Sequence, residues 1–235
     1  MASAGQQGHR WVIFYTLQKQ KNPYNGYMPN YSKQPEYHTK SEKIKAREQV
    51  VAVYREITGL ESIPQDRGYW TFCARQPNTD GAEIVQLVKC GLMQKNQFFG
   101  VDYDRNDEGI IEFNRQQHPE AHWFKGEWLE VIENNYEIFN PSLVYFDYTK
   151  TIVTVECHKY LARTMNWCPK NTVVAANLML SDGHSLRHES DERYDPDFLI
   201  KSLGKYLRHN WEVFPRYYPY KSSRTPMGTF ILYKK

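Results

Sequence analysis

Residues 97–128 read QFFGVDYDRNDEGIIEFNRQQHPEAHWFKGEW, and the pattern within them decides the fold class. An apolar run, Gln97–Asp102, has the length of a strand, and an amphipathic segment, Glu108–Gln117, has the spacing of a helix. A second apolar run, Ala121–Lys125, follows. Strand, helix and strand in this order predict two parallel strands joined by a crossover helix.

The same alternation continues on both sides of this segment. Further strands are expected over Gly68–Ala74, Leu143–Asp147 and Thr172–Leu180, and further helices over Gly81–Leu92, Trp128–Asn135, Val153–Met165 and from Asp195-Pro196 to about Asn210. Two closing runs, Trp211–Tyr217 and Met227–Tyr233, have no helix between them and predict an antiparallel hairpin. The pattern therefore predicts an α/β domain whose mostly parallel sheet is covered by helices on both faces.

The N-terminal quarter of the chain has a different composition. Trp11–Leu17 is a short apolar run, and Lys19–Lys40 is an irregular basic arm rich in tyrosine. A helix is expected over Ile44–Ile57, with Gly59 ending it. We therefore expect residues 1–60 to form a basic arm and helix, and residues 61–235 to form the α/β domain.

Charge is unevenly distributed although the formal net charge is only +3. Residues 1–60 carry nine Lys/Arg against four Asp/Glu, residues 61–180 carry eleven against sixteen, and residues 181–235 carry ten against seven. An acidic middle between basic ends suits a cationic cofactor and a polyanionic partner, and ordinary surface variation is the alternative.

Cysteine usage and hydropathy favour a cytoplasmic protein. The four cysteines form no CxxC pair, no apolar run is long enough to cross a membrane, and no secretory signal is evident. His184 and His188 have a spacing that could bind a metal, but a charged surface loop is the favoured interpretation, so no metal site is expected.

The acids that follow the two strands carry a family resemblance. Gly100-Val101-Asp102 and Gly126-Glu127-Trp128 resemble two motifs of the class I, Rossmann-like S-adenosylmethionine-dependent methyltransferases. The resemblance implies a seven-stranded sheet in the order 3-2-1-4-5-7-6 and S-adenosylmethionine as the cofactor. It also implies that Asp102 binds the ribose hydroxyls, that Tyr103 lies against adenine, and that Glu127 accepts from the adenine amino group. Trp128 is predicted to belong to the same cofactor-binding site. Helix capping is the alternative role for both acids.

The fourth expected strand ends in Asp147-Tyr148. In the amino-methyltransferases of this class, the corresponding strand ends in D/N-P-P-Y/F, whose acid or amide accepts from the target amine while the aromatic ring stacks on the base. The resemblance gives Asp147 and Tyr148 that catalytic position. Both prolines are missing, which puts the transfer of these roles in doubt.

The first strand–helix loop departs further from the family. The family has a glycine-rich loop that lets the backbone approach the cofactor. This chain has Cys73-Ala74-Arg75-Gln76-Pro77-Asn78-Thr79-Asp80-Gly81, with a single glycine. Cys73, Ala74, Arg75 and Gly81 are the positions that would face the methionine end of the cofactor.

The segment joining the closing strands mixes aromatic and basic residues. Aromatic rings can stack on unpaired bases while cations meet phosphates, and the alternative is a solvated loop. The residues predicted to contact nucleic acid are Arg216, Tyr218, Tyr220, Lys221 and Arg224. The abundance of tyrosine also suits a protein partner.

Two functions follow from these patterns. The first is a methyltransferase that moves a methyl group from S-adenosylmethionine to an amine or similar nucleophile on nucleic acid. The second is a catalytically inactive protein of the same fold that serves as a nucleic-acid-binding or protein-assembly module. The acids after the second and third strands favour the first, and the altered loop and missing prolines favour the second.

Overall fold

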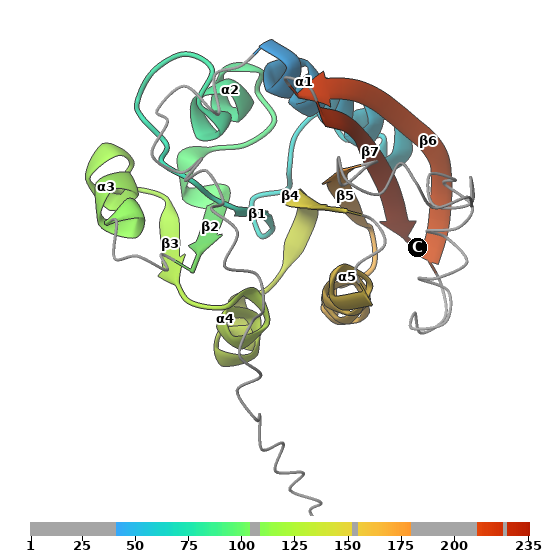
Figure 1. Cartoon of the computed structure of the whole chain (residues 1–235). Coiled ribbons are helices and arrows are strands. Elements are labelled where there is room, and N and C mark those ends of the chain that lie inside the picture. The colour runs from blue at the N-terminus through green and yellow to red at the C-terminus, as the bar shows by residue number, and fades with distance from the viewer. Residues whose placement is uncertain (1–40, 104–108, 152–154, 180–210, 223–224) are drawn as a thin grey trace, which may run out of the picture. The chain divides into compact units, whose positions relative to one another are not determined.

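Seven strands form one sheet in the order β3-β2-β1-β4-β5-β7-β6 (Figure 1). The strands are β1 Gly68–Phe72, β2 Phe98–Asp102, β3 His122–Lys125, β4 Pro141–Thr151, β5 Thr172–Met179, β6 Trp211–Ser222 and β7 Thr225–Lys234. Strands β1 to β5 pair in parallel, and β7 runs antiparallel to both β5 and β6. The predicted strand order and the single reversed strand are confirmed.

The computed structural model describes residues 41–103, 109–151, 155–179, 211–222 and 225–235. All of them belong to one compact unit, Tyr31–Lys235, so the predicted N-terminal helix belongs to the same unit as the sheet. Three expectations lie outside the described residues: the run Trp11–Leu17, the arm Lys19–Lys40 and the helix after Asp195-Pro196. The charged loop with His184 and His188 lies outside them as well.

Helices cover both faces of the sheet (Figure 1). The helices are α1 Ser41–Thr58, α2 Glu83–Lys89, α3 Ile110–Gln117, α4 Trp128–Asn134 and α5 Val155–Trp167, with short 3-10 turns η3 Lys95–Gln97 and η4 Tyr136–Ile138. Buried side chains of α4 and α5 belong to one hydrophobic cluster, and those of α1, α2 and α3 belong to a second. The predicted arrangement of layers is therefore present.

Strand β4 shows why a sheet buried on both faces needs an uninterrupted apolar run. Leu143 and Tyr145 belong to the cluster under α1 and α2, whereas Val144 and Phe146 belong to the cluster under α4 and α5. All four side chains are at most 2% exposed. Successive side chains of a strand point to opposite faces, so each residue of the run LVYF fills one of the two cores.

The aromatic segment near the C-terminus is strand rather than loop. We expected the first closing run to stop at Tyr217, but β6 continues to Ser222 and pairs with β7 throughout. A register shift between Phe214 and Tyr217 takes up Pro215, and Pro219 pairs opposite Gly228. Because β6 is the edge strand, a proline that lacks an N–H can be accommodated there.

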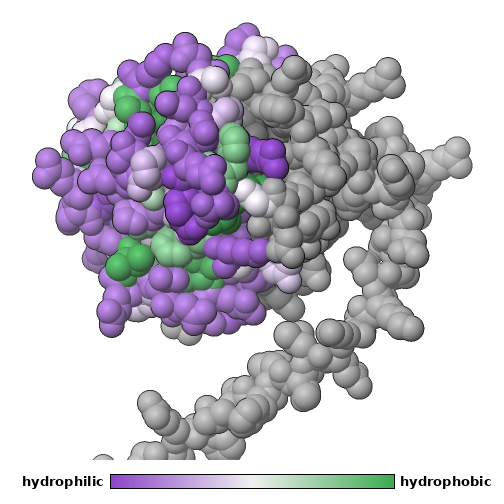
Figure 2. Space-filling model, turned by 90° about the vertical axis from the view of Figure 1, so that its left-hand side faces the viewer, coloured by the Kyte–Doolittle hydropathy of each residue, from purple (hydrophilic) through white to green (hydrophobic). Residues whose placement is uncertain are grey.

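Polar side chains dominate the face that Figure 2 shows, with small and separate hydrophobic areas between them. Among the described residues, the large hydrophobic side chains that are exposed are Leu60, Tyr103, Tyr136 and Ile138. No helix of the described part of the chain is long and apolar enough to cross a membrane.

Gly100 gives a direct test of the packing between β2 and β3. It pairs with Trp123, and a Cβ at position 100 would lie 2.6 Å from the indole ring. We expect Gly100→Ala to lower the free energy of unfolding by about 1–3 kcal/mol, measured by urea denaturation. In a Trp123→Leu background the same substitution should cost less, and equal costs in both backgrounds would contradict the assigned clash.

Candidate functional site

The predicted nucleoside-binding acids lie on one rim of the sheet, at the carboxyl ends of its parallel strands. Asp102, the last residue of β2, pairs with Lys125, the last residue of β3. The backbone carbonyl of Asp102 accepts a 3.0 Å hydrogen bond from the N–H of Gly126, so Glu127 follows directly from a residue bonded to Asp102. In open α/β sheets ligands bind outside this rim.

Asp102 lies near a buried thiol and is followed by an exposed tyrosine. The Cys73 side chain is 3% exposed, and burial, with a further contribution from the charge of Asp102, raises the pKa of its thiol well above the ordinary value. Cys73 is therefore a neutral packing group rather than a nucleophile. Tyr103 is 53% exposed.

Glu127 caps helix α4. Its Oε2 accepts hydrogen bonds from the backbone N–H groups of Leu129, at 2.9 Å, and Glu130, at 3.3 Å. The capping role that the sequence offered as an alternative is thus present, and contact with adenine stays a prediction. Trp128 is 2% exposed, and its indole N–H donates to Thr164 at 2.8 Å, so its side chain belongs to the core between α4 and α5.

Helix α3 holds the glycine-poor first loop in place. Asn114 donates to the carbonyl oxygen of Ala74 at 2.9 Å and accepts from the N–H of Gln76 at 2.7 Å. The ring of His118 lies 3.0 Å from the carbonyl oxygen of Gln76, a contact in which Nε2 donates. Both side chains are fully buried. Side chains of α3 therefore fix the loop that glycines shape in the resembling family.

Arg75 points toward α3 as well. Its guanidinium lies over the ring of Phe113, 5.4 Å from the ring centre, an arrangement that favours a cation. At the other end of the loop, Gly81 has a φ of 90°, which only glycine adopts readily. The Gly81 carbonyl accepts a 3.1 Å hydrogen bond from Arg47 of helix α1.

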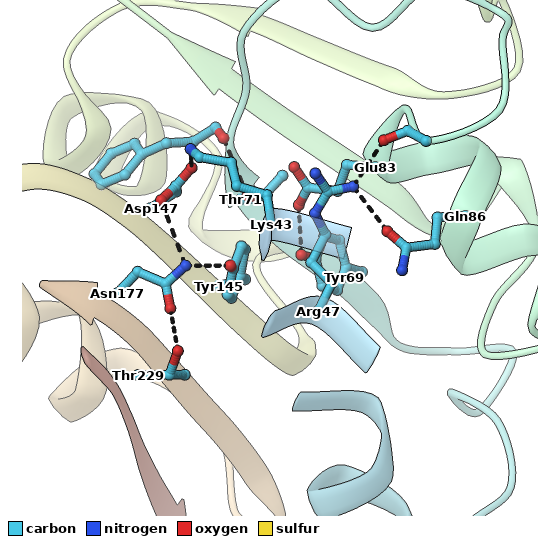
Figure 3. Close-up of polar contacts among 12 residues, drawn as sticks. Lys43, Arg47, Tyr69, Thr71, Glu83, Gln86, Tyr145, Asp147, Asn177 and Thr229 are labelled. Atoms are coloured by element: carbon cyan, nitrogen blue, oxygen red, sulfur yellow. Dashed lines mark hydrogen bonds and ion pairs between the residues drawn. The ribbon is translucent and has the colours of Figure 1, made fainter. Parts of the chain in front are cut away.

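Asp147, the predicted acceptor-side residue, contacts a lysine that the sequence did not indicate as functional. The ammonium of Lys43, on α1, forms an ion pair with the Asp147 carboxylate (Figure 3). The Lys43 side chain is 3% exposed and that of Asp147 is 13% exposed. A charge is buried at this depth only when an opposite charge or hydrogen bonds compensate it.

Three polar side chains lie behind this pair. Asn177, on β5, directs its amide nitrogen toward the Tyr145 hydroxyl and toward Asp147, whose Oδ1 is 3.4 Å away. Thr229, on β7, donates to the Asn177 carbonyl oxygen at 2.6 Å (Figure 3). The three side chains are fully or almost fully buried. They link Asp147 to β5 and β7.

A second buried charge on α1 faces the first loop. Arg47 donates to Gln86 at 2.9 Å and lies near Glu83, and Tyr69 donates to the Glu83 carboxylate (Figure 3). Burial raises the pKa of Glu83, and the charge of Arg47 opposes that rise. Helix α1 therefore contacts both the loop that holds the cofactor in the resembling family and the predicted acceptor residue.

The sequence contains a pattern that could have identified Lys43 and Arg47. Lys43 and Arg47 continue the i, i+3, i+4 spacing of Val50 and Tyr54, which pack under the sheet. Cations on the apolar stripe of a helix indicate buried partners. The partner of Lys43 lies 104 residues away, so only the tertiary fold identifies it.

The remaining predicted residues lie in β4, β6 or outside the described chain. We expected the fourth strand to end at Asp147, but β4 continues to Thr151, so Asp147 and Tyr148 both lie within it. In β6, Tyr218, Tyr220 and Lys221 pair with β7, and Arg216 lies in the register shift. Arg224 is outside the described residues. Within the described ranges, no three His, Cys, Asp or Glu side chains gather as a metal ion would require.

The strand order is that of the class I S-adenosylmethionine-dependent methyltransferase fold, which this chain has. The O-methyltransferase TomG from Streptomyces achromogenes, solved in complex with SAM, is similar over 89% of this chain and 91% of its own, with 10% identity and a TM-score of 0.53. The cofactor-bound Rv0187 from MTB is similar over 86% and 84%, with 11% identity and a TM-score of 0.52. No protein-family model and no curated protein matches the sequence.

Asn114 provides a test of the loop clamp. Asn114→Ala removes both hydrogen bonds to the first loop and leaves buried backbone groups unsatisfied, so it should lower the free energy of unfolding by about 2 kcal/mol. Gln116→Ala, at an exposed position of the same helix, is the matched control and should change it by less than about 0.5 kcal/mol. Equal effects of the two substitutions in urea denaturation would refute the clamp.

His118 should make stability fall in mild acid. Burial, together with the charge of Lys95, lowers the pKa of His118 below its ordinary value of 6.5. As the pH falls below about 6.5 the unfolded chain therefore takes up a proton before the folded chain does, and the free energy of unfolding decreases. His118→Gln keeps a donor for Gln76 but cannot titrate, so it should flatten this slope between about pH 7 and pH 5. An unchanged slope would show that other groups cause it.

Proposed function

We propose that this protein binds S-adenosylmethionine and transfers its methyl group to a nucleophile held beside Asp147. One observation carries the proposal: Asp102 and Glu127 lie on one rim of the sheet, joined through the bond between Gly126 and Asp102. Asp147 lies on the same rim, because β4 is parallel to β1 and β1 is parallel to β2. The residues proposed to bind the nucleoside and the residue proposed to bind the acceptor therefore lie along the same rim of the sheet.

The nucleoside half of the cofactor fits the residues present. A half-buried carboxylate such as Asp102 can accept two hydrogen bonds from the ribose diol, and the exposed ring of Tyr103 can cover adenine. Glu127 would accept from the adenine amino group, with Trp128 holding helix α4 behind it. The similar protein TomG, which was solved in complex with SAM, supports the choice of cofactor.

The first loop would receive the methionine end. Cys73 and Ala74 continue β1 to the rim, Arg75 offers a cation for a carboxylate, and Gly81 precedes helix α2. When bound, the cofactor supplies an electrophilic methyl group. The residues of this chain would act by holding the acceptor in line with it, which needs no nucleophile on the protein.

Nucleic acid is the proposed source of the acceptor. The basic and aromatic positions Arg216, Tyr218, Tyr220 and Lys221 lie on β6, which reaches the acceptor strand β4 through β7 and β5. Tyr148 would stack on a base next to Asp147. Lys/Arg→Ala changes on β6 would then weaken binding uniformly across nucleic-acid sequences.

A binding module without catalysis is the second candidate. The contact that favours it is the buried ion pair of Asp147 with Lys43, because helix α1 covers the carboxylate that an acceptor would need to reach. In that case the described basic positions of β6 would carry the function, and the rim would bind no cofactor. Binding of the demethylated cofactor therefore separates the two candidates.

S-adenosylhomocysteine at 100 times its dissociation constant should stabilise the protein by about 2.7 kcal/mol, visible as a rise in the melting temperature. Asp102→Ala should abolish this rise because it removes the ribose ligand. Glu133→Ala, at an exposed acid of α4 that pairs with Arg163, is the matched control and should retain it. A rise that survives Asp102→Ala would show that the ribose assignment is wrong.

Two substitutions of Glu127 distinguish a capping role from a role in ligand binding. Glu127→Ala should cost about 1 kcal/mol of stability whether or not a cofactor binds, because the cap of α4 is lost. Glu127→Ser keeps a capping oxygen but cannot reach as far as the carboxylate. If the serine variant keeps both stability and the full rise with S-adenosylhomocysteine, Glu127 is a cap only.

A further inference from the structure

Helix α1 brings a fixed positive charge to the acceptor side of the rim. The Lys43 ammonium contacts the Asp147 carboxylate while almost the whole lysine side chain is buried. Four residues further along, Arg47 is anchored to Gly81 and Gln86. Because both residues lie on one helix, the contacts of Arg47 fix the position from which Lys43 reaches Asp147 (Figure 3).

The carboxylate is held in orientation as well. Asn177 faces Asp147 with its amide nitrogen because its carbonyl oxygen accepts from Thr229. Two donors, an ammonium and an amide, therefore approach Asp147 from different elements. The acceptor side thus contains an oriented ion pair, rather than the carboxylate next to prolines that the amino-methyltransferases use.

An ion pair of this kind distinguishes between acceptors by charge. A neutral amine that attacks a methyl group becomes positively charged at nitrogen before it loses a proton, and the Lys43–Asp147 pair, which has no net charge, gives that charge no net stabilisation. A hydroxyl oxygen gains negative character as its proton passes to Asp147, and the Lys43 ammonium, whose counter-charge is then neutralised, stabilises that oxygen. We propose that Lys43 makes the acceptor a hydroxyl group rather than an amine, a proposal that rests on the methyl transfer proposed above.

The transfer balances without a further reactant. The acceptor oxygen forms a bond to the methyl carbon as the carbon–sulfur bond breaks, and the sulfur keeps the electron pair of that bond. The hydroxyl proton passes to the Asp147 carboxylate and then to solvent. Lys43 keeps its proton throughout and acts only through its charge.

The charge of Lys43 can be tested by binding alone. S-adenosylmethionine is a cation at sulfur and S-adenosylhomocysteine is not. If the methyl group is delivered beside Asp147 as proposed above, removing the Lys43 charge leaves the carboxylate uncompensated, which favours the first ligand relative to the second. Lys43→Met should tighten S-adenosylmethionine relative to S-adenosylhomocysteine by about tenfold in calorimetric titrations. The ratio of the two dissociation constants is insensitive to partial unfolding of a variant, since both ligands bind the same folded fraction.

Two variants control for this experiment. Lys43→Arg keeps the charge and should leave the ratio within about twofold of wild type. Lys45→Met removes an exposed cation from the same helix and should also leave the ratio within about twofold of wild type. An unchanged ratio in Lys43→Met would overturn the inference while leaving the proposed function standing. Failure of the wild type to bind either ligand would instead remove the proposed function, and the inference with it.

Product chemistry gives the second measurement. A random-sequence RNA pool offers ribose hydroxyls and base amines in the same molecules, so it lets the protein choose between them. After incubation with S-adenosylmethionine labelled in the methyl group, the label should appear on oxygen in the nucleoside digest of the RNA. Label on a base nitrogen would overturn the inference, and without any label the ratio of dissociation constants decides.

Discussion

The ion pair between Lys43 and Asp147 joins parts of the chain that are 104 residues apart, and much of the rim depends on it. Removing two charges from water costs several kcal/mol per ion, so such a pair persists only where its geometry is well supported. Here the support comes from Arg47 on the helix side and from Asn177 on the sheet side. The contacts of Arg47 and Asn177 therefore help to offset the free energy that burying the pair costs.

The fold could be predicted because its signals are local. The run Leu143–Phe146 is apolar on both alternating faces, which marks a strand buried in a parallel sheet, and the helix-free hairpin marks the reversed strand β7. The ends of strands were harder to predict where two sequence signals conflict. Pro215 and Pro219 suggested a loop, but an edge strand with a shift in register tolerates both.

The candidate site was only partly visible in the sequence. Asp102, Glu127 and Asp147 could be found because each lies at or just after the expected end of a strand, and the carboxyl ends of parallel strands share one rim. The groups that each acid contacts could not be found from the sequence. Glu127 looks the same in sequence whether it caps α4 or binds adenine, and the contact of Lys43 with Asp147 requires knowing which face of α1 meets the end of β4.

The sequence also could not show how the first loop is held in place. A loop with one glycine seemed unable to approach a cofactor, because the sequence shows which residues it lacks but not what replaces them. In the structure Asn114 of α3 and His118, the residue that follows α3, hold the loop, while Arg47 of α1 holds Gly81. Arg47 and Lys43 are one helical turn apart, so α1 sets the separation between the first loop and Asp147. The loop and the acceptor residue are therefore both held by a helix that precedes the sheet in the chain.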